Sequence, residues 1–287
     1  MSTSDSSTLR KDRFSPLPRH WLGKTGHSPW QLAKAAQPPY ITDLSWQPTT
    51  GEVTAALKIY ITLIAMVDDE KQTRNVGANC LRTTYEELQL YLKLSRALIR
   101  EGLKLLEATD AIARLGYKPL VYRVKGLDQK NKEEWMGHVK LPKGHLFGMR
   151  RYSSANPIML ADYPTRGMAA MNGLVIYLLL LSVVQRNNNV ALISYDRVYE
   201  RTGIRSKNLR KALDLLINHD LITVLRLNNE STFEAFGLPV TDAELRGTPS
   251  VYLPKGLKGR KYNERVNTLE EMLNQRLSAQ ARADFID

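Results

Sequence analysis

Basic side chains recur at helical spacing in two segments of the chain. In the first, Arg96, Arg100 and Lys104 are four residues apart, which places them on one face of a helix. The second is basic at its start and contains Arg205, Ser206, Lys207, Arg210 and Lys211. Guanidinium and ammonium groups bind phosphate oxygens and base edges, and the start of a helix favours an anion. The spacing therefore predicts two helices that contact double-stranded DNA.

Further basic residues lie in two expected β-hairpins, where such side chains commonly touch the DNA backbone or the minor groove. They are Arg114, Lys118, Arg123 and Lys125 in the first hairpin and Arg226, Arg246 and Lys255 in the second. Any one of these basic residues, taken singly, could be an ordinary solvated charge. Arg100 and Arg210 occupy the same register in the two segments, however, and this favours a shared role.

The basic helices belong to a unit that occurs twice. The segment around Leu81 to Ala113 returns around Leu192 to Thr223 with the same apolar spacing, at an offset of 110 residues. The positions that match are Leu94, Ile99, Arg100, Leu103, Leu105, Leu106 and Ile112 against Ile204, Leu209, Arg210, Leu213, Leu215, Leu216 and Ile222. Further matches are Ile59-Tyr60 with Ile176-Tyr177 at 117, Leu17-Pro18-Arg19 with Leu141-Pro142-Lys143 at 124, and Val121-Tyr122 with Val251-Tyr252 at 130. The offset changes at expected loops, where inserted residues are tolerated.

The first copy reads as three helices followed by a hairpin. Apolar residues predict a helix over 52–66 with one wide buried face, and a Thr-Thr-x-Glu-Glu pattern starts a second helix over 85–91. Ser95 caps a third helix over 95–108, and two alternating strands surround the turn at 116–119. Two closely spaced helices with a following hairpin are typical of a winged helix-turn-helix.

The second copy repeats this order. We predict helices over 168–184, from Ser194, and over 206–218, followed by strands at 221–227 and 250–253. The loop at 228–248 between these strands contains its own apolar residues, so part of it is expected to pack, although a simple surface insertion explains it equally well.

The predicted fold class is mostly α with small β wings, arranged as two tandem winged helix-turn-helix domains. The boundaries are a Pro/Ser-rich arm at 1–50 with one short helix near 30–36, a first domain at 51–127, a connector at 128–165, a second domain at 166–256, and a basic segment with a C-terminal helix at 257–287. The apolar stripe of that last helix fits either docking on the protein's own domains or formation of a homodimer or oligomer on DNA.

Composition limits the classes of partner and compartment. Lysine and arginine exceed aspartate and glutamate by 41 to 29, giving a net charge of +12, which favours a polyanionic partner such as nucleic acid. The single cysteine, Cys80, excludes an internal disulfide and a zinc finger. The longest apolar run, Gly173 to Val184, is shorter than the roughly 20 residues of a membrane-spanning helix, so we expect no membrane partner and a cytoplasmic location.

Signals of enzymatic chemistry are weak in this sequence. Gly23-Lys24-Thr25 resembles the end of a phosphate-binding loop, but Pro18 stands where that motif needs its first glycine. The histidines His20, His27, His138, His145 and His219 show no paired metal-ligand spacing. We therefore expect no catalytic residues, no metal and no cofactor.

The two expected winged helices are each preceded by a Leu-Pro-basic segment, LPRHWL in the first copy and VKLPKGHLF in the second. Together they resemble the tandem winged-helix replication initiators of plasmids and other mobile elements. The resemblance implies sequence-specific binding to double-stranded DNA at an origin or at repeated sites. A transcriptional repressor with the same domains and a winged-helix adaptor that binds protein are the alternatives.

Overall fold

The computed structural model describes residues 14–18, 48–67, 77, 79–117, 120–127, 138–147, 159–184, 189–226 and 250–257. Within these residues the order strand, long helix, strand, two helices and two strands occurs twice, and the second unit has two further short helices after its first strand. Unit one contains β1 (Ser15–Pro18), α3 (Thr50–Val67), β2 (Cys80–Thr83), α5 (Tyr85–Leu92), α6 (Arg96–Ala108), β3 (Ile112–Tyr117) and β4 (Leu120–Val124). Unit two contains β5 (His138–Leu141), α7 (Lys143–Phe147), α8 (Met159–Asp162), α9 (Met168–Val183), β6 (Ala191–Ile193), α10 (Tyr195–Thr202), α11 (Ser206–Asn218), β7 (Ile222–Arg226) and β8 (Ser250–Pro254). The expected helix at 30–36, the loop at 228–248, the C-terminal helix and Lys118 lie outside the described residues.

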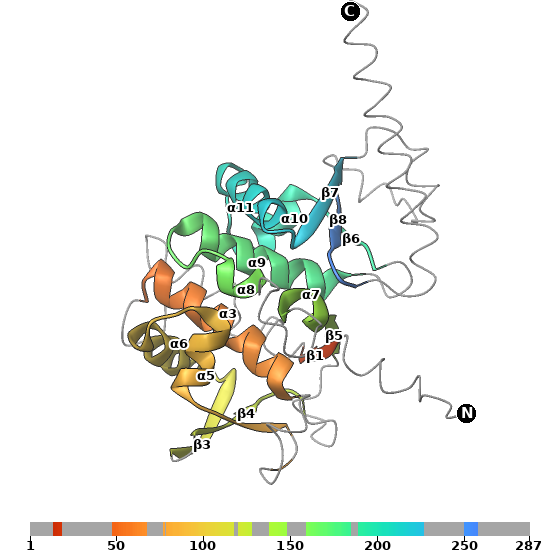
Figure 1. The fold of residues 1–287 in the computed structure, drawn as a ribbon. Coiled ribbons are helices and arrows are strands. Elements are labelled where there is room, and N and C mark those ends of the chain that lie inside the picture. Colours follow the sequence, from red (N-terminus) through yellow and green to blue (C-terminus); the bar gives the residue numbers. More distant parts are fainter. Residues whose placement is uncertain are drawn as a thin grey trace, which may run out of the picture.

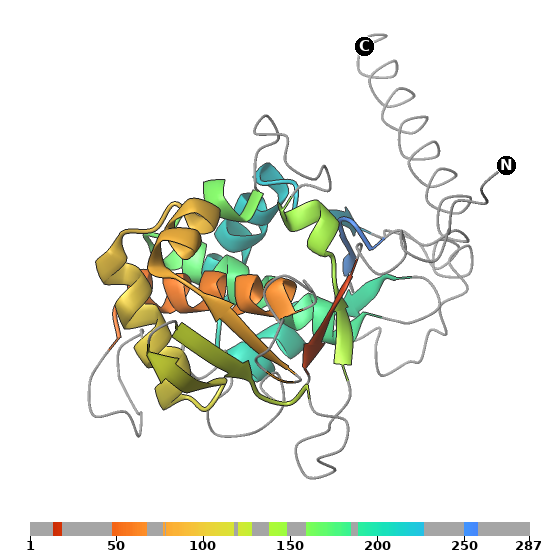
Figure 2. The ribbon, with the colours of Figure 1, turned by 60° about the horizontal axis from the view of Figure 1, so that its bottom comes forward.

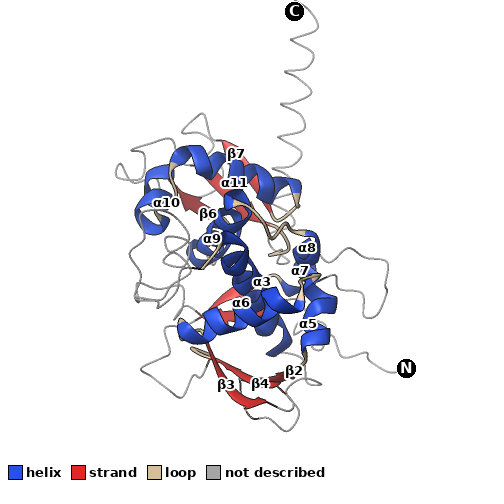
Figure 3. Cartoon of the chain, turned by 90° about the vertical axis from the view of Figure 1, so that its left-hand side faces the viewer, coloured by secondary structure: helices blue, strands red, loops and turns tan. Residues whose placement is uncertain are grey.

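The described part combines helices with small antiparallel sheets. The strands form sheets of order β2-β4-β3 in unit one and β6-β8-β7 in unit two, and the two sheets lie at opposite ends of the molecule with helices between them (Figures 1 and 3). The first strand of each sheet, β2 and β6, was not predicted.

Side-chain caps begin the helices where the sequence predicts. Thr84 forms a capping box with Glu87 at the start of α5, and Ser95 accepts a hydrogen bond from the Leu98 N–H at the start of α6. Ser194 caps α10 in the same way. These caps confirm the predicted starts of the three helices.

The backbone confirms that the unit is repeated. Left-handed conformations occur at equivalent positions: Asn79 and Asn189, Lys93 and Gly203, Asp110 and Asp220, and Gly126 and Gly256. An ion pair between Asp110 and Lys125 in unit one recurs between Asp220 and Lys255 in unit two, at 3.7 Å. Turn geometry is therefore repeated even where the residue type has changed.

One continuous core joins the two units. Helix α3 packs on α6 and also on α9, which in turn packs on α11, and Figure 1 shows these four helices stacked through the middle of the molecule. The prediction that α3 buries only one wide face is wrong, because every residue from Val53 to Met66 is buried. The second face of α3 is covered by α9, a partner that local periodicity does not show.

Helix α3 is also the one described helix long and apolar enough to cross a membrane, judged by length and composition alone. In the structure 78% of its apolar window is buried inside the protein. Core helices of soluble proteins pass the same test, so its composition is explained by packing between α6 and α9.

Strands β1 and β5, which precede the first long helix of each unit, pair with each other. They form a two-stranded antiparallel sheet and lie side by side in Figure 2. The predicted arm and connector thus each contribute a strand to the described fold.

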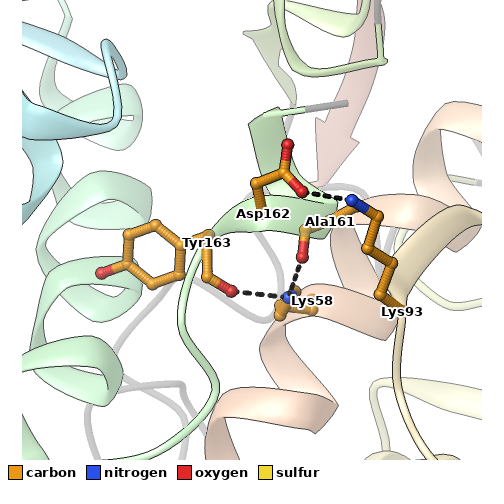
Figure 4. Close-up of polar contacts among 5 residues, drawn as sticks. All are labelled: Lys58, Lys93, Ala161, Asp162 and Tyr163. Atoms are coloured by element: carbon orange, nitrogen blue, oxygen red, sulfur yellow. Dashed lines mark hydrogen bonds and ion pairs between the residues drawn. The ribbon is translucent and has the colours of Figure 1, made fainter. Parts of the chain in front are cut away.

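A buried lysine connects α3 to the segment that leads into α9. The Lys58 ammonium donates to the carbonyl oxygens of Ala161 at 3.3 Å and Tyr163 at 2.8 Å, while Asp162 between them pairs with Lys93 (Figure 4). Desolvation lowers the pKa of Lys58 to about 8, although the Asp162 charge opposes the shift. Two lysines of unit one, Lys58 and Lys93, therefore contact the end of α8 and the residue that follows it.

The segment that leads into α9 also contacts α9 and the end of α11. The Tyr163 hydroxyl donates to the Ala170 carbonyl at 3.0 Å, and its ring lies 5.2 Å from the ring of His219 at the end of α11. Desolvation lowers the pKa of His219, with the charge of Asp162 opposing. Tyr163 thus links the start of α9 to the end of α11.

Candidate nucleic-acid interface

The α10–α11 pair presents the predicted basic residues of unit two. Gly203, in the left-handed conformation, ends α10 and lets the chain turn sharply into α11. Helix α11 buries Leu209, Ala212, Leu213 and Leu216, as predicted. Its start and outer face leave exposed Arg205, Ser206, Lys207, Arg210 and Lys211.

No ion pair within the described residues involves the basic residues of this face. Arg205 stands at the N-cap position of α11, and its side chain makes no capping hydrogen bond there. The backbone N–H groups of the first turn and the helix dipole add to the positive potential at this end. The start of α11 thus combines exposed cationic side chains with the positive end of the helix dipole.

The corresponding face of α6 is exposed but carries its own counter-charges. Arg96 pairs with Glu86 at 3.1 Å and lies 5.0 Å from the centre of the Tyr85 ring, and Arg100 pairs with Glu101 at 2.9 Å. The pKa of Glu86 is lowered, mainly by a backbone hydrogen bond and further by Arg96. Lys104 is exposed on the same helix. Positive charge on α6 is therefore compensated locally.

Charge counts over the two helix pairs agree with these contacts. Residues 85–108 contain four basic and four acidic side chains, whereas residues 195–218 contain six basic and three acidic ones. The potential that attracts a polyanion is thus concentrated on unit two.

The basic residues of the first hairpin are placed differently from the prediction. Arg114 donates to Glu107 at 2.9 Å and lies over the rings of Tyr117 and Tyr122, with 24% of its side chain exposed. Lys125 pairs with Asp110 and has 27% of its side chain exposed. Both side chains hold elements of unit one together, so they are less available to an external partner.

The remaining predicted hairpin residues add little to the described interface. Arg123 is half-buried on β4. Arg226 lies in β7, and its side chain, like Lys118, is outside what the structure describes.

Sequence reasoning missed two exposed basic residues on α10, next to the basic face of α11. Arg197 and Arg201 are exposed on this helix, four residues apart, and Tyr199 between them is 52% exposed. In a helix-turn-helix the first helix of the motif crosses the DNA backbone, where such side chains meet phosphates. Their spacing was visible in the sequence as the same signal that marked α6.

The stacking of the helices sets the distance between the axes of α6 and α11, the two helices with basic outer faces. Successive packing of α6 on α3, α3 on α9 and α9 on α11 makes three helix-to-helix steps. At about 8–10 Å per step, α6 and α11 lie up to about 30 Å apart.

Other chemistry has little support in the described ranges, where no group of three His, Cys, Asp or Glu residues could hold a metal ion. Cys80 is buried, and desolvation raises the pKa of its thiol. Comparison with known proteins found no matching family model, no matching curated protein and no matching solved structure.

Proposed function

We propose that the two units are winged helix-turn-helix domains and that the protein binds double-stranded DNA in a sequence-specific manner. The order helix, strand, two helices and two strands, with a three-stranded sheet, supports this assignment in both units. In such a domain the second helix of the turn motif enters the major groove, which makes α6 and α11 the recognition helices.

The observation that carries this proposal is the exposed basic face at the start of α11. Its guanidinium groups can bind guanine edges in pairs of hydrogen bonds, and its ammonium groups neutralise phosphates. The first turn of α11 directs backbone N–H groups to the same side. Unit one adds a second, weaker contact through α6.

A salt titration on random duplex DNA tests the proposal. We expect binding at low salt that weakens steeply, because each phosphate contact contributes about −0.9 to the slope of log affinity against log salt. A slope that corresponds to several contacts is expected from the basic residues of α10 and α11. Absence of binding at low salt would overturn the proposal and leave a protein-binding adaptor as the alternative.

For the biological process we propose initiation of replication at repeated sites on a plasmid or other mobile element, on the basis of the architectural resemblance. The selected DNA site, placed in several copies on a circle that cannot replicate alone, should allow its maintenance when the protein is supplied. Repression of a reporter promoter by the same sites, without maintenance of the circle, would instead assign a transcriptional repressor.

A further inference from the structure

The outer face of α11 carries one carboxylate among its basic residues. The helix buries Leu209, Ala212, Leu213 and Leu216, so the positions opposite the core are 207, 211, 214 and 218. The residues there are exposed and are spaced as one stripe along the helix: Lys207, Lys211, Asp214 and Asn218. Asp214 thus stands in the middle of the face that the proposed function assigns to DNA.

Asp214 is not neutralised by the cations beside it. Arg210 and Lys211 stand four and three residues before it, the spacings at which opposite charges meet on a helix. Within the part of the chain that the structure describes, however, Asp214 has no hydrogen bond and no ion pair. On α6, by contrast, Glu101 pairs with Arg100 at 2.9 Å. The carboxylate of Asp214 is therefore free to meet a group that the face of α11 contacts.

A carboxylate at this place opposes contact with phosphate. Phosphate oxygens are negative in every duplex, so Asp214 lowers the affinity of α11 for the DNA backbone whatever the sequence. It gains only from a hydrogen-bond donor, and the donors in the major groove are the amino groups of cytosine and adenine. Adenine places its N7 acceptor beside the amino group, whereas cytosine presents no acceptor at that edge. Cytosine is thus the base that suits a carboxylate.

We propose that Asp214 is a specificity-determining residue that accepts a hydrogen bond from the N4 amino group of a cytosine in the major groove. The assignment rests on the proposed DNA-binding function. A group that weakens contact with the wrong partner and improves contact with the right one raises specificity. Asp214 lies seven residues after Lys207, about 10 Å along the helix. At about 3.4 Å per base pair, the cytosine lies within about three base pairs of the pair that Lys207 contacts.

Selection of bound duplexes from a random library, with the wild type and with Asp214→Asn, tests the assignment. The wild type should enrich cytosine at one position, and Asp214→Asn should lose that preference while it keeps the others. Loss of this base contact should lower the ratio of affinities for selected and random duplex about tenfold. Affinity for random duplex should rise about two- to fivefold at low salt, because one negative charge has been removed.

Glu200→Gln is the matched control, because Glu200 is an exposed carboxylate on the neighbouring helix α10. It removes the same charge and should raise the affinities for selected and random duplex by the same factor. Equal ratios in Asp214→Asn and Glu200→Gln would overturn the proposal, as would a wild-type site without the cytosine. If the wild type binds no duplex at low salt, the proposed function itself has failed.

A modified base separates the hydrogen bond from the charge. N4-methylcytosine still pairs with guanine, but it presents a methyl group to the major groove in place of the amino hydrogen. At the selected cytosine it should weaken binding of the wild type about tenfold and leave binding of Asp214→Asn nearly unchanged. Equal losses in the two proteins would show that Asp214 does not contact this amino group.

Discussion

Arg100 and Arg210 occupy the same position of two helices with the same packing, yet the side chains that follow them carry opposite charges. The residue that follows Arg100 is Glu101, which pairs with it, whereas the residue that follows Arg210 is Lys211. The apolar register fixes how each helix packs and leaves the outer positions free to change. The repeat therefore keeps the two helical scaffolds alike, while the charge on their outer faces differs.

Removing the matched arginine of each helix together with one further basic residue should break this comparison most visibly. Lys207→Ala with Arg210→Ala should lower affinity for the selected duplex on the order of 100-fold, since each base or phosphate contact contributes about 1–3 kcal/mol. Arg96→Ala with Arg100→Ala should cost less than a tenth of that factor, because those side chains are already paired. Fluorescence anisotropy at fixed salt measures both, and equal losses would show that the units contribute equally.

A second difference lies in the core, where α3 has Lys58 at the position that Val175 occupies in α9. The pKa of Lys58 falls from 10.5 to about 8, so above pH 8 the unfolded chain binds more protons than the folded one. Stability should rise from pH 8 to about 10.5, by up to about 3 kcal/mol from this group. Below pH 8 the cost of burying the charge is fully present.

Lys58→Met should remove this rise in the free energy of unfolding, measured by denaturant titration at pH 7 to 10. Lys93→Met is the control, because Lys93 is exposed and pairs with the same Asp162. An unchanged pH dependence in Lys58→Met would show that Lys58 is not the titrating group.

The turns between the paired helices offer a smaller test. Gly203 and Lys93 both adopt the left-handed conformation, which costs a residue with a side chain about 1 kcal/mol or more. Gly203→Ala should destabilise the protein by about 1 kcal/mol. Lys93→Gly should gain part of that amount, reduced by the lost pair with Asp162. Thermal melts at one pH compare the two variants. A stabilising effect of Gly203→Ala would contradict the left-handed conformation of Gly203.

The smallest effect is expected from freeing Arg100 of its partner. Glu101→Gln removes an exposed ion pair and one negative charge from the face of α6. Affinity for DNA should rise about two- to fivefold at low salt, since such surface pairs are weak and like charges repel phosphate. Asn218→Asp adds a negative charge to the end of α11, the other proposed recognition helix, and serves as the opposite control. A loss of affinity in Glu101→Gln would show that Glu101 positions Arg100.

The sequence predicted the helices well because their signals are local. Ser95 and Ser194 cap helices at the expected positions, and the apolar period of α11 matches its buried residues. Strands β2 and β6 are too short for an alternating pattern to be recognised. The all-round burial of α3 depends on α9, more than a hundred residues away in the chain.

For the interface, the sequence identified which side chains face outward and did not predict which are already paired. The pairing of Arg96 with Glu86 crosses from α6 to α5 and depends on the angle between these helices. Arg114 resembled an exposed hairpin cation, but Glu107 and two tyrosine rings enclose it. Lysine normally lies at the surface, so the sequence does not indicate that Lys58 is buried in the core.

The shared core has a consequence for how the chain is made. Until α9 has been synthesised, the face of α3 that packs against it is uncovered, and β1 lacks the strand that completes its sheet. A nascent unit one would therefore expose apolar surface while translation continues, a state prone to aggregation. Expression of residues 1–127 alone should yield an aggregating or chaperone-bound product, because unit one needs the second half of the chain to cover its core.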